Sequence, residues 1–349
     1  MNDNLLEGKT ILLLMPNFNE LQNEISKQLQ MMGAKVLWFQ TQRSPSDFRF
    51  KKNRFECLVY KIVKPFFYTR QTSHILSEIK DECVDYVFAI YNYSPQYRLI
   101  KRLKEKNPKL KTYIYFWDAF STWDFRYQMD YFDYKFSFDR EDCLTYAEKG
   151  LKYLPLFWIN KSNYSSELKY DIVHIGSAHP KYKDRIPLVL ELVKQARKVG
   201  LNYYVRFSSW FPLRRTSIKS KLMCLIFRNY KEYVCTLRTI DDEYPGIIMD
   251  GKLPLKYVNE IEAQSRCVVD VNLDRSGVAL RVIKALASGK KVITNNPHII
   301  NEKFYRPENI KIINKNEVSL DVDWIKSPFV PVDVSYLRLD NWLKYIFSH

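Results

Sequence analysis

The chain has 349 residues, of which 46% are hydrophobic and 27% charged, and this length predicts two domains rather than one hydrophobic core. It contains no apolar run of the roughly 18 residues that a membrane-spanning helix needs, and the apolar run Thr10–Met15 after the polar start Met1–Lys9 is too short for a signal peptide, so we expect a cytoplasmic protein. Six cysteines without a CxxC pair disfavour a zinc site and a disulfide framework, and a formal charge of +16 favours a polyanionic partner: nucleic acid, anionic lipid or a phosphorylated substrate.

The first half alternates apolar, strand-like runs with amphipathic segments, which is the pattern of a parallel α/β sheet. The expected strands are Thr10–Met15, Val36–Phe39, Tyr86–Ile90, Thr112–Phe116 and Tyr134–Phe138. The expected helices are Leu21–Met32, Thr72–Glu82, Pro95–Lys106 and Asp139–Lys149.

A second α/β series follows a polar, turn-rich stretch at residues 158–169. Its expected strands are Ile172–Ile175, Tyr203–Phe207, Cys267–Val271, Lys291–Thr294 and Ile310–Ile313, and its expected helices are Ile186–Val199, Leu255–Ser265 and Val278–Ser288. We therefore predict two Rossmann-like, doubly wound domains facing a cleft, over residues 1–157 and 158–333. Residues 334–349 are expected to form a helix that can cross back to the first domain.

The segment Val268–Pro297 predicts a strand, a loop, a helix, a glycine and a second strand. The loop contains Asp274, Ser276 and Gly277, and free N–H groups at a helix that starts from Gly277 would bind a diphosphate. Arg281 lies one turn inside this helix and can reach back to the same phosphate, because helical side chains lean toward the N-terminus. The alternative is an ordinary helix whose polar face meets solvent.

The stretch GVALRVIKALASGKKVITNNPHIINEKFYRPENIKII resembles the C-terminal signature of bacterial lipopolysaccharide and capsule glycosyltransferases, including the CgeB-like group. The matching residues are Gly277, Arg281, Gly289, Asn295, Asn296, Phe304, Tyr305, Pro307, Glu308 and Asn309. The stretches Tyr170–His179 and Tyr115–Trp158 also resemble that family. Lys284 departs from it, because the family usually has a glutamate there that accepts hydrogen bonds from the donor ribose. Lys284 is then expected to add a phosphate contact or to face solvent.

The resemblance implies a GT-B glycosyltransferase with its donor in the C-terminal domain. Such an enzyme moves a sugar from a nucleotide-activated donor, which is a co-substrate, to a lipid-linked or lipopolysaccharide or capsule glycan, with no other cofactor. It would work at the inner face of the plasma membrane. Two alternatives stay open: a catalytically degenerate GT-B scaffold, and a basic nucleic-acid-binding protein. We see no nucleic-acid-binding motif, so we expect no nucleic acid as partner.

A second small-residue loop is expected after the strand Ile172–Ile175. Gly176 and Ser177 would let the backbone approach a phosphate, and His179 or Arg185 could reach the leaving group. The alternative is a plain turn with solvated basic residues. The loop lacks the GxGxxG spacing, which disfavours a Rossmann dehydrogenase.

The acceptor and the general base are expected in the first domain. Asp118 follows the strand Thr112–Phe116 directly and is the best candidate for the base, with Trp117 and Trp123 nearby to stack on sugar and Asn17 lining the cleft. The alternative is that Asp118 caps a helix. Asp139 is a weaker candidate, because it has the pattern of an N-cap.

Two further segments bear on metal and membrane. The one Asp-x-Asp triplet, Asp321-Val322-Asp323, lies near the C-terminus and is interpreted as the start of a terminal segment, so no metal is expected. Residues 206–238 contain eight Lys or Arg against one Glu. Residues 210–230 within them are expected to bind an anionic membrane surface, or alternatively to form a buried helix with basic ends.

Overall fold

The computed structural model describes residues 5–18, 20–41, 66, 68–90, 97–122, 124, 126–160, 167–178, 185–209, 228–271, 276–314 and 318–349. The chain divides into two compact units. The first contains residues 1–159, 275–277 and 336–349, and the second contains residues 160–274 and 278–335. The boundary thus lies two residues beyond the predicted position.

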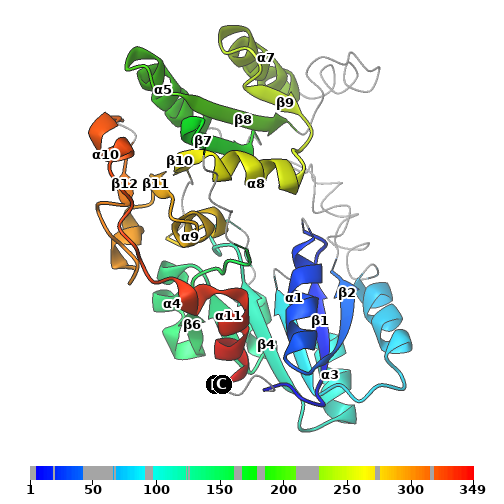
Figure 1. Ribbon diagram of the computed structural model, residues 1–349. Coiled ribbons are helices and arrows are strands. Elements are labelled where there is room, and N and C mark those ends of the chain that lie inside the picture. Colours follow the sequence, from blue (N-terminus) through cyan, green and yellow to red (C-terminus); the bar gives the residue numbers. More distant parts are fainter. Residues whose placement is uncertain are drawn as a thin grey trace. The chain divides into compact units, whose positions relative to one another are not determined.

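The first unit is built on a parallel sheet with the strand order β2-β1-β3-β4-β5-β6 (Figure 1). Its strands are β1 Thr10–Met15, β2 Lys35–Gln40, β3 Tyr86–Ile90, β4 Lys111–Phe116, β5 Tyr134–Ser137 and β6 Leu151–Tyr153. Its helices are α1 Leu21–Met31, residues 68–78, α3 Tyr97–Lys106 and α4 Arg140–Thr145, with the short 3-10 segments η2 Arg126–Tyr131 and η3 Ala147–Lys149. β1 is almost continuously apolar because both of its faces are covered.

The last helix, α11 (Leu339–Phe347), belongs to the first unit although the segment before it belongs to the second. Its Trp342 is fully buried and donates from Nε1 to the carbonyl of Pro155 at 2.9 Å. The Phe347 ring packs against Phe88 and Tyr113, with ring centres 5.3 and 4.9 Å apart. Apolar side chains therefore fix this terminal helix on the first sheet.

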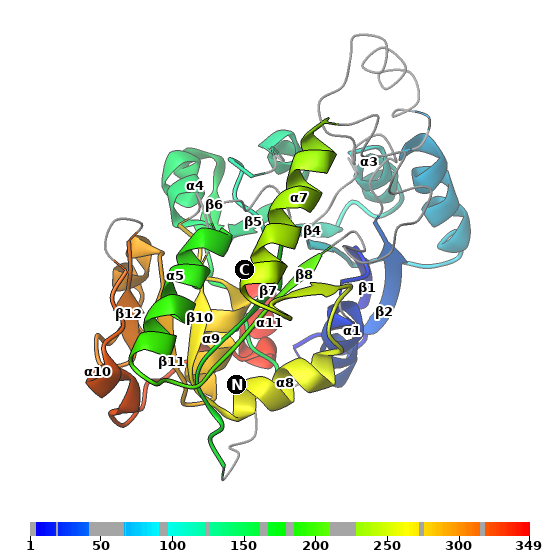
Figure 2. The ribbon, with the colours of Figure 1, turned by 90° about the horizontal axis from the view of Figure 1, so that it is seen from above.

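The second unit is also built on a parallel six-stranded sheet, in the order β12-β11-β10-β7-β8-β9. Its strands are β7 Tyr170–Ser177, β8 Tyr203–Ser209, β9 Ile248–Asp250, β10 Ser265–Asp270, β11 Lys291–Thr294 and β12 Ile310–Ile312. Its helices are α5 Arg185–Lys198, α7 Arg228–Glu243, α8 Leu255–Ala263, α9 Leu280–Ala287 and α10 Val322–Lys326. Helices α5 and α7 cover one face of this sheet and α8 the other (Figures 1 and 2), which confirms the predicted doubly wound α/β class.

Candidate functional site

The second sheet reverses its direction of growth between β7 and β10. Counted within the unit, the order β9-β8-β7-β10-β11-β12 is 3-2-1-4-5-6. In open α/β sheets of this kind, ligands bind outside the carboxyl ends of the strands at the reversal point. The strand residues at that point are Ser177, at the end of β7, and Asp270, at the end of β10.

Arg185, the first residue of α5, joins these two strand ends. The side chain is buried. Its Nε donates to the carbonyl of Val271 at 2.8 Å and its Nη1 to the carbonyl of Ser177 at 3.5 Å. The sequence analysis predicted that Arg185 could reach the leaving group or else be solvated. The structure places its guanidinium group at the reversal point, where it is buried and bridges the two strands.

Arg281, the second residue of α9, reaches the same edge. Its Nη2 donates to the carbonyl of Ile175, and its Nη1 lies 3.8 Å from Oδ1 of Asp270. The side chain is 28% exposed, whereas that of Asp270 is only 7% exposed. These three side chains carry two positive charges and one negative charge, and Arg281, which lies beside Asp270, is the more exposed of the two arginines.

His174 lies in β7, close enough to the two arginines for their charges to act on it. It is 1% exposed, and its Nδ1 is 2.8 Å from the carbonyl oxygen of Val269 on β10. Burial, and then the charges of Arg281 and Arg185, hold the pKa of His174 well below its usual value of 6.5, so the ring is neutral. No sequence pattern pointed to this histidine, because its position on the strand is that of an ordinary core residue.

The predicted turn at Gly176 and Ser177 is wrong in its local structure. Both residues continue β7 and pair with Phe207 and Ser208 of β8. The strand runs two residues further than its apolar core because the β8 backbone extends alongside it. His179 of the same predicted loop, and Asp274 of the other, lie outside the described residues.

The helix predicted to open at Gly277 begins instead at Leu280. Ser276 and Gly277 belong to the first unit, and their N–H groups donate to Oδ2 of Asp139 at 2.9 and 3.2 Å. Their backbone therefore binds a protein carboxylate in this structure, not a free phosphate. Gly277 is required for close approach, because a Cβ there would lie 2.3 Å from Cδ2 of Phe138.

Asp139, the weaker candidate for the base, is a buried structural acceptor. Besides the two N–H groups above, its Oδ1 accepts from Asp142 N at 3.0 Å, as the N-cap of α4, and from Ser276 Oγ at 2.8 Å. Ser276 Oγ in turn accepts from Glu141 N at 2.9 Å. Four donors saturate the carboxylate, which favours the capping interpretation.

Lys284 neither faces solvent nor stands free for a phosphate. Its Nζ donates to Oδ1 of Asn259 and to Oε2 of Glu262, both at 2.6 Å. The lysine and glutamate side chains are 15% and 11% exposed. The positive charge of Lys284, where the resemblance leads one to expect a glutamate, is thus paired with the carboxylate of Glu262 in α8.

Asp118 lies where the sequence predicted, directly after β4, and its side chain is largely buried. The neighbouring Trp117 packs its ring against Phe18, with ring centres 5.9 Å apart. Phe18 follows the exposed Asn17 in the loop after β1. The loops after β1 and β4 therefore meet at the carboxyl edge of the first sheet, while Trp123 lies outside the described residues.

Asp142 is a titratable group in the first turn of α4. Its Oδ2 accepts from the backbone N–H of Phe120 at 2.8 Å, so it holds the loop that carries Asp118. Burial, with the nearby charges of Asp139 and Glu141, raises the pKa of Asp142 to about 6. The hydrogen bond to Phe120 and the burial of Asp142 arise only on folding, so the sequence alone does not distinguish this carboxyl from that of an ordinary residue in a first helical turn.

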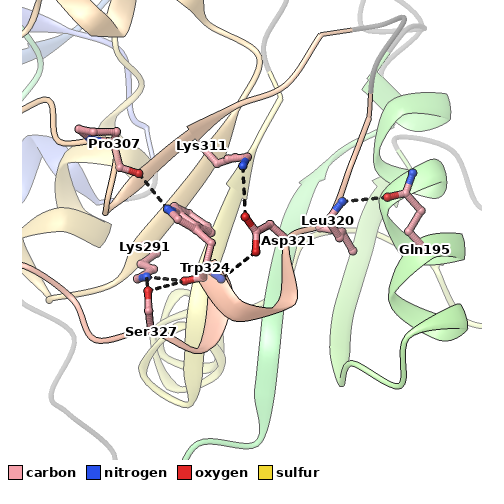
Figure 3. A network of polar contacts seen from close by, with 8 residues as sticks. All are labelled: Gln195, Lys291, Pro307, Lys311, Leu320, Asp321, Trp324 and Ser327. Carbon is pink, nitrogen blue, oxygen red and sulfur yellow. Dashed lines mark hydrogen bonds and ion pairs between the residues drawn. The ribbon is translucent and has the colours of Figure 1, made fainter.

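The Asp-x-Asp triplet caps a helix. Asp321 accepts from Trp324 N at 2.9 Å as the N-cap of α10 and lies 3.5 Å from Nζ of Lys311 (Figure 3). Leu320 N, just before it, donates to Gln195 Oε1 of α5 at 2.9 Å. Asp321 and Leu320 thus hold the segment after β12 on the second unit.

The membrane prediction falls mostly on residues 210–227, which lie outside the described residues. Arg228 and Tyr230 begin α7, a helix of 16 residues that the sequence analysis did not predict. In the part of the chain that the structure describes, no helix is both long and apolar enough to cross a membrane.

No protein-family model and no curated protein sequence matches the chain, but solved structures do. Sucrose-phosphate synthase from Thermosynechococcus elongatus aligns with a TM-score of 0.51 at 10% identity, over 97% of this chain and 90% of that one. A glycosyltransferase from Rickettsia africae gives a TM-score of 0.50 at 12% identity, over 97% and 88%. The UDP-GlcNAc 2-epimerase of Methanocaldococcus jannaschii, in complex with UDP-GlcNAc and UDP, gives 0.50 at 11% identity, over 97% and 99%.

The chain has the GT-B fold. The sequence resemblance implied this fold, and two parallel six-stranded sheets with these matches confirm it. These three neighbours are named for different reactions, namely sucrose-phosphate synthesis, glycosyl transfer and epimerisation, and each aligns over most of the chain. The reaction must therefore be argued from the site and not from the fold.

Proposed function

We propose that the chain is a glycosyltransferase that takes a sugar from a nucleotide-activated donor. The observation that carries the proposal is the placement of Arg185 and Arg281 at the carboxyl ends of β7 and β10, in the GT-B fold. A guanidinium group matches phosphate oxygens in charge and geometry. A neighbour of the same fold is complexed with UDP-GlcNAc and UDP, so a uridine diphosphate donor is the first to test.

In this proposal Arg281 contacts the diphosphate, and the buried Arg185 adds positive charge at the same strand ends. As the bond between the sugar and the diphosphate breaks, negative charge develops on the leaving UDP. Fixed positive groups then stabilise the transition state more than the ground state. These guanidinium groups supply the charge that a metal ion would otherwise supply, so the reaction is proposed to need no metal.

The first unit would bind the acceptor. Asp118, at the carboxyl end of β4, would accept the proton of the acceptor hydroxyl as its oxygen attacks the sugar. Trp117 and the loop after β1 would pack against the acceptor. From the sequence resemblance, we propose a lipid-linked, lipopolysaccharide or capsule glycan as acceptor. The enzyme would sit at the cytoplasmic face of the membrane, held through residues 210–230.

The proposal is tested by supplying UDP-sugars labelled in the sugar, with and without bacterial membrane glycolipid fractions. Glycosyl transfer predicts label in the acceptor and free UDP in equal amounts. A labelled epimer formed without acceptor would support the epimerase chemistry of the M. jannaschii neighbour instead. If neither product forms with any UDP-sugar, the degenerate scaffold becomes the better account.

Asp118→Asn should lower turnover by about 10²–10⁴-fold, the usual cost of losing a general base, and leave UDP affinity unchanged. Asp124→Asn is the matched control, because Asp124 is also an aspartate after β4, but its side chain is 56% exposed and paired with Arg126. If Asp118→Asn turns over substrate as fast as the wild type, Asp118 has a structural role and is not the general base.

A further inference from the structure

His174 has an unsatisfied side-chain atom at the reversal point of the second sheet. Its Nε2 is buried and has no hydrogen-bond partner among the described residues. Gly176, two residues along β7, lies beside it on the same face of the sheet, and a Cβ at Gly176 would lie 2.6 Å from Nε2. Buried polar atoms in native structures nearly always have a partner, so this one needs an explanation.

The hydrogen bond on the other ring nitrogen defines the state of Nε2. The carbonyl of Val269 can only accept, so the Nδ1 atom 2.8 Å away carries the proton. Nε2 of the neutral ring therefore has a lone pair. The ring is held in place, because it also packs against Phe207 of β8 with ring centres 5.1 Å apart.

The charged groups around His174 come from three elements. Arg185 begins α5, Arg281 lies in α9, and both guanidinium groups act on the imidazole. Asp270 ends β10 and lies against Arg281. The packed aromatic residue of β8 brings no charge. In the free protein, the two positive charges and burial oppose a third positive charge on the ring.

We propose that the binding of a nucleotide diphosphate drives the uptake of one proton at Nε2 of His174. The inference rests on the proposed function, in which Arg281 contacts the diphosphate. The diphosphate neutralises the two guanidinium charges and adds negative charge to the edge, which stabilises an imidazolium beneath it. The proton comes from solvent and forms an N–H bond at the lone pair. The imidazolium then stabilises the charge that develops on the leaving UDP.

The test is calorimetry of UDP binding in buffers of different ionisation enthalpy, from pH 6 to pH 8. UDP itself titrates near neutral pH, so the readout is the difference between the wild type and His174→Phe. The wild type should take up about one proton more per UDP at the acidic end. The affinity of the wild type for UDP should then fall, relative to that of the variant, by up to about tenfold for each unit that the pH rises, as one linked proton requires.

Two further variants complete the test. His174→Asn retains a donor for the carbonyl of Val269 but cannot be protonated, so it should behave like His174→Phe and replaces it if that variant does not fold. His74→Phe removes an exposed imidazole of the first unit and should retain the full proton uptake. Equal uptake in the wild type and the His174 variants would overturn this inference and leave the donor site intact. No binding of UDP to the wild type would overturn both.

Discussion

Replacing Asp139 by Asn tests whether a buried carboxylate holds the segment before α9. Asn retains one oxygen, so the cap of α4 can survive. It places an NH₂ group where Oδ2 now accepts from Ser276 N and Gly277 N. Each hydrogen bond to a charged group contributes about 1.5–3 kcal/mol, so the loss of two predicts about 3 kcal/mol when the lower value is taken for both. For a unit of this size that corresponds to a fall of roughly 6–12 °C in melting temperature.

The matched control is Asp321→Asn, because Asp321 is also an N-cap but is exposed and accepts its cap bond from Trp324 N. It should cost only a few tenths of a kcal/mol, since Asn and Asp cap equally well. Ser276→Ala, combined with Asp139→Asn in a double-mutant cycle, should be less than additive because both changes break the same network. Differential scanning calorimetry measures the wild type and the four variants. A melting temperature for Asp139→Asn as high as that of Asp321→Asn would refute the reasoning.

Three more predictions concern stability and are checked by thermal melting. Gly277→Ala should destabilise the fold by about 1–3 kcal/mol, as overpacking does, because its Cβ would lie 2.3 Å from a Phe138 ring carbon and 2.7 Å from the Phe138 carbonyl oxygen. Lys284→Ala should cost about 3 kcal/mol by leaving Glu262 unpaired, and adding Glu262→Gln should recover part of that loss. Asp142→Asn should change the pH profile: burial raises the pKa of Asp142 from 3.8 to about 6, so the folded chain binds this proton more tightly and loses stability as pH rises from about 4 to 6. The variant should lack that loss and melt higher than the wild type at pH 7 but not at pH 4.

Most of both sheets could be predicted from the sequence, because strands covered on both faces are continuous apolar runs. β1, β3 and β11 have the predicted bounds. The three-residue edge strands β6 and β9 were missed. β12 is equally short, but the isoleucines Ile310, Ile312 and Ile313 gave it a β-branched pattern that the sequence shows. The polar helix α7 was missed because its charged residues were interpreted as part of the basic segment.

The family-like residues after α9 could be located but not explained from the sequence. Asn296 caps the 3-10 segment Pro297–Asn301, and Asn309 bonds both backbone groups of Val330. These residues therefore stabilise the fold, and the signature that suggested a function is partly a packing signature. Arg281 is the member of the set that combines exposure with a position at the reversal point.

The remaining differences come from contacts between residues far apart in the chain. Ser276 and Asp139 are 137 positions apart, and no local pattern shows that a carboxylate will meet the N–H groups expected to bind phosphate. The neutrality of His174 likewise depends on two arginines from other elements. Hydrophobic periodicity predicts elements, whereas the electrostatics of a site depend on which elements the fold brings together.

The placement of the donor diphosphate at Arg281 is the central claim, and calorimetric titration with UDP tests it most directly. Wild type and Arg281→Ala are compared with Arg266→Ala, which removes an arginine paired with Asp171 at the opposite end of β10. We expect UDP to bind the wild type and Arg266→Ala equally. Arg281→Ala should bind at least tenfold more weakly, the loss of about 1.5–3 kcal/mol from one charged contact. Equal affinity of all three proteins for UDP, or no binding to the wild type, would contradict the account.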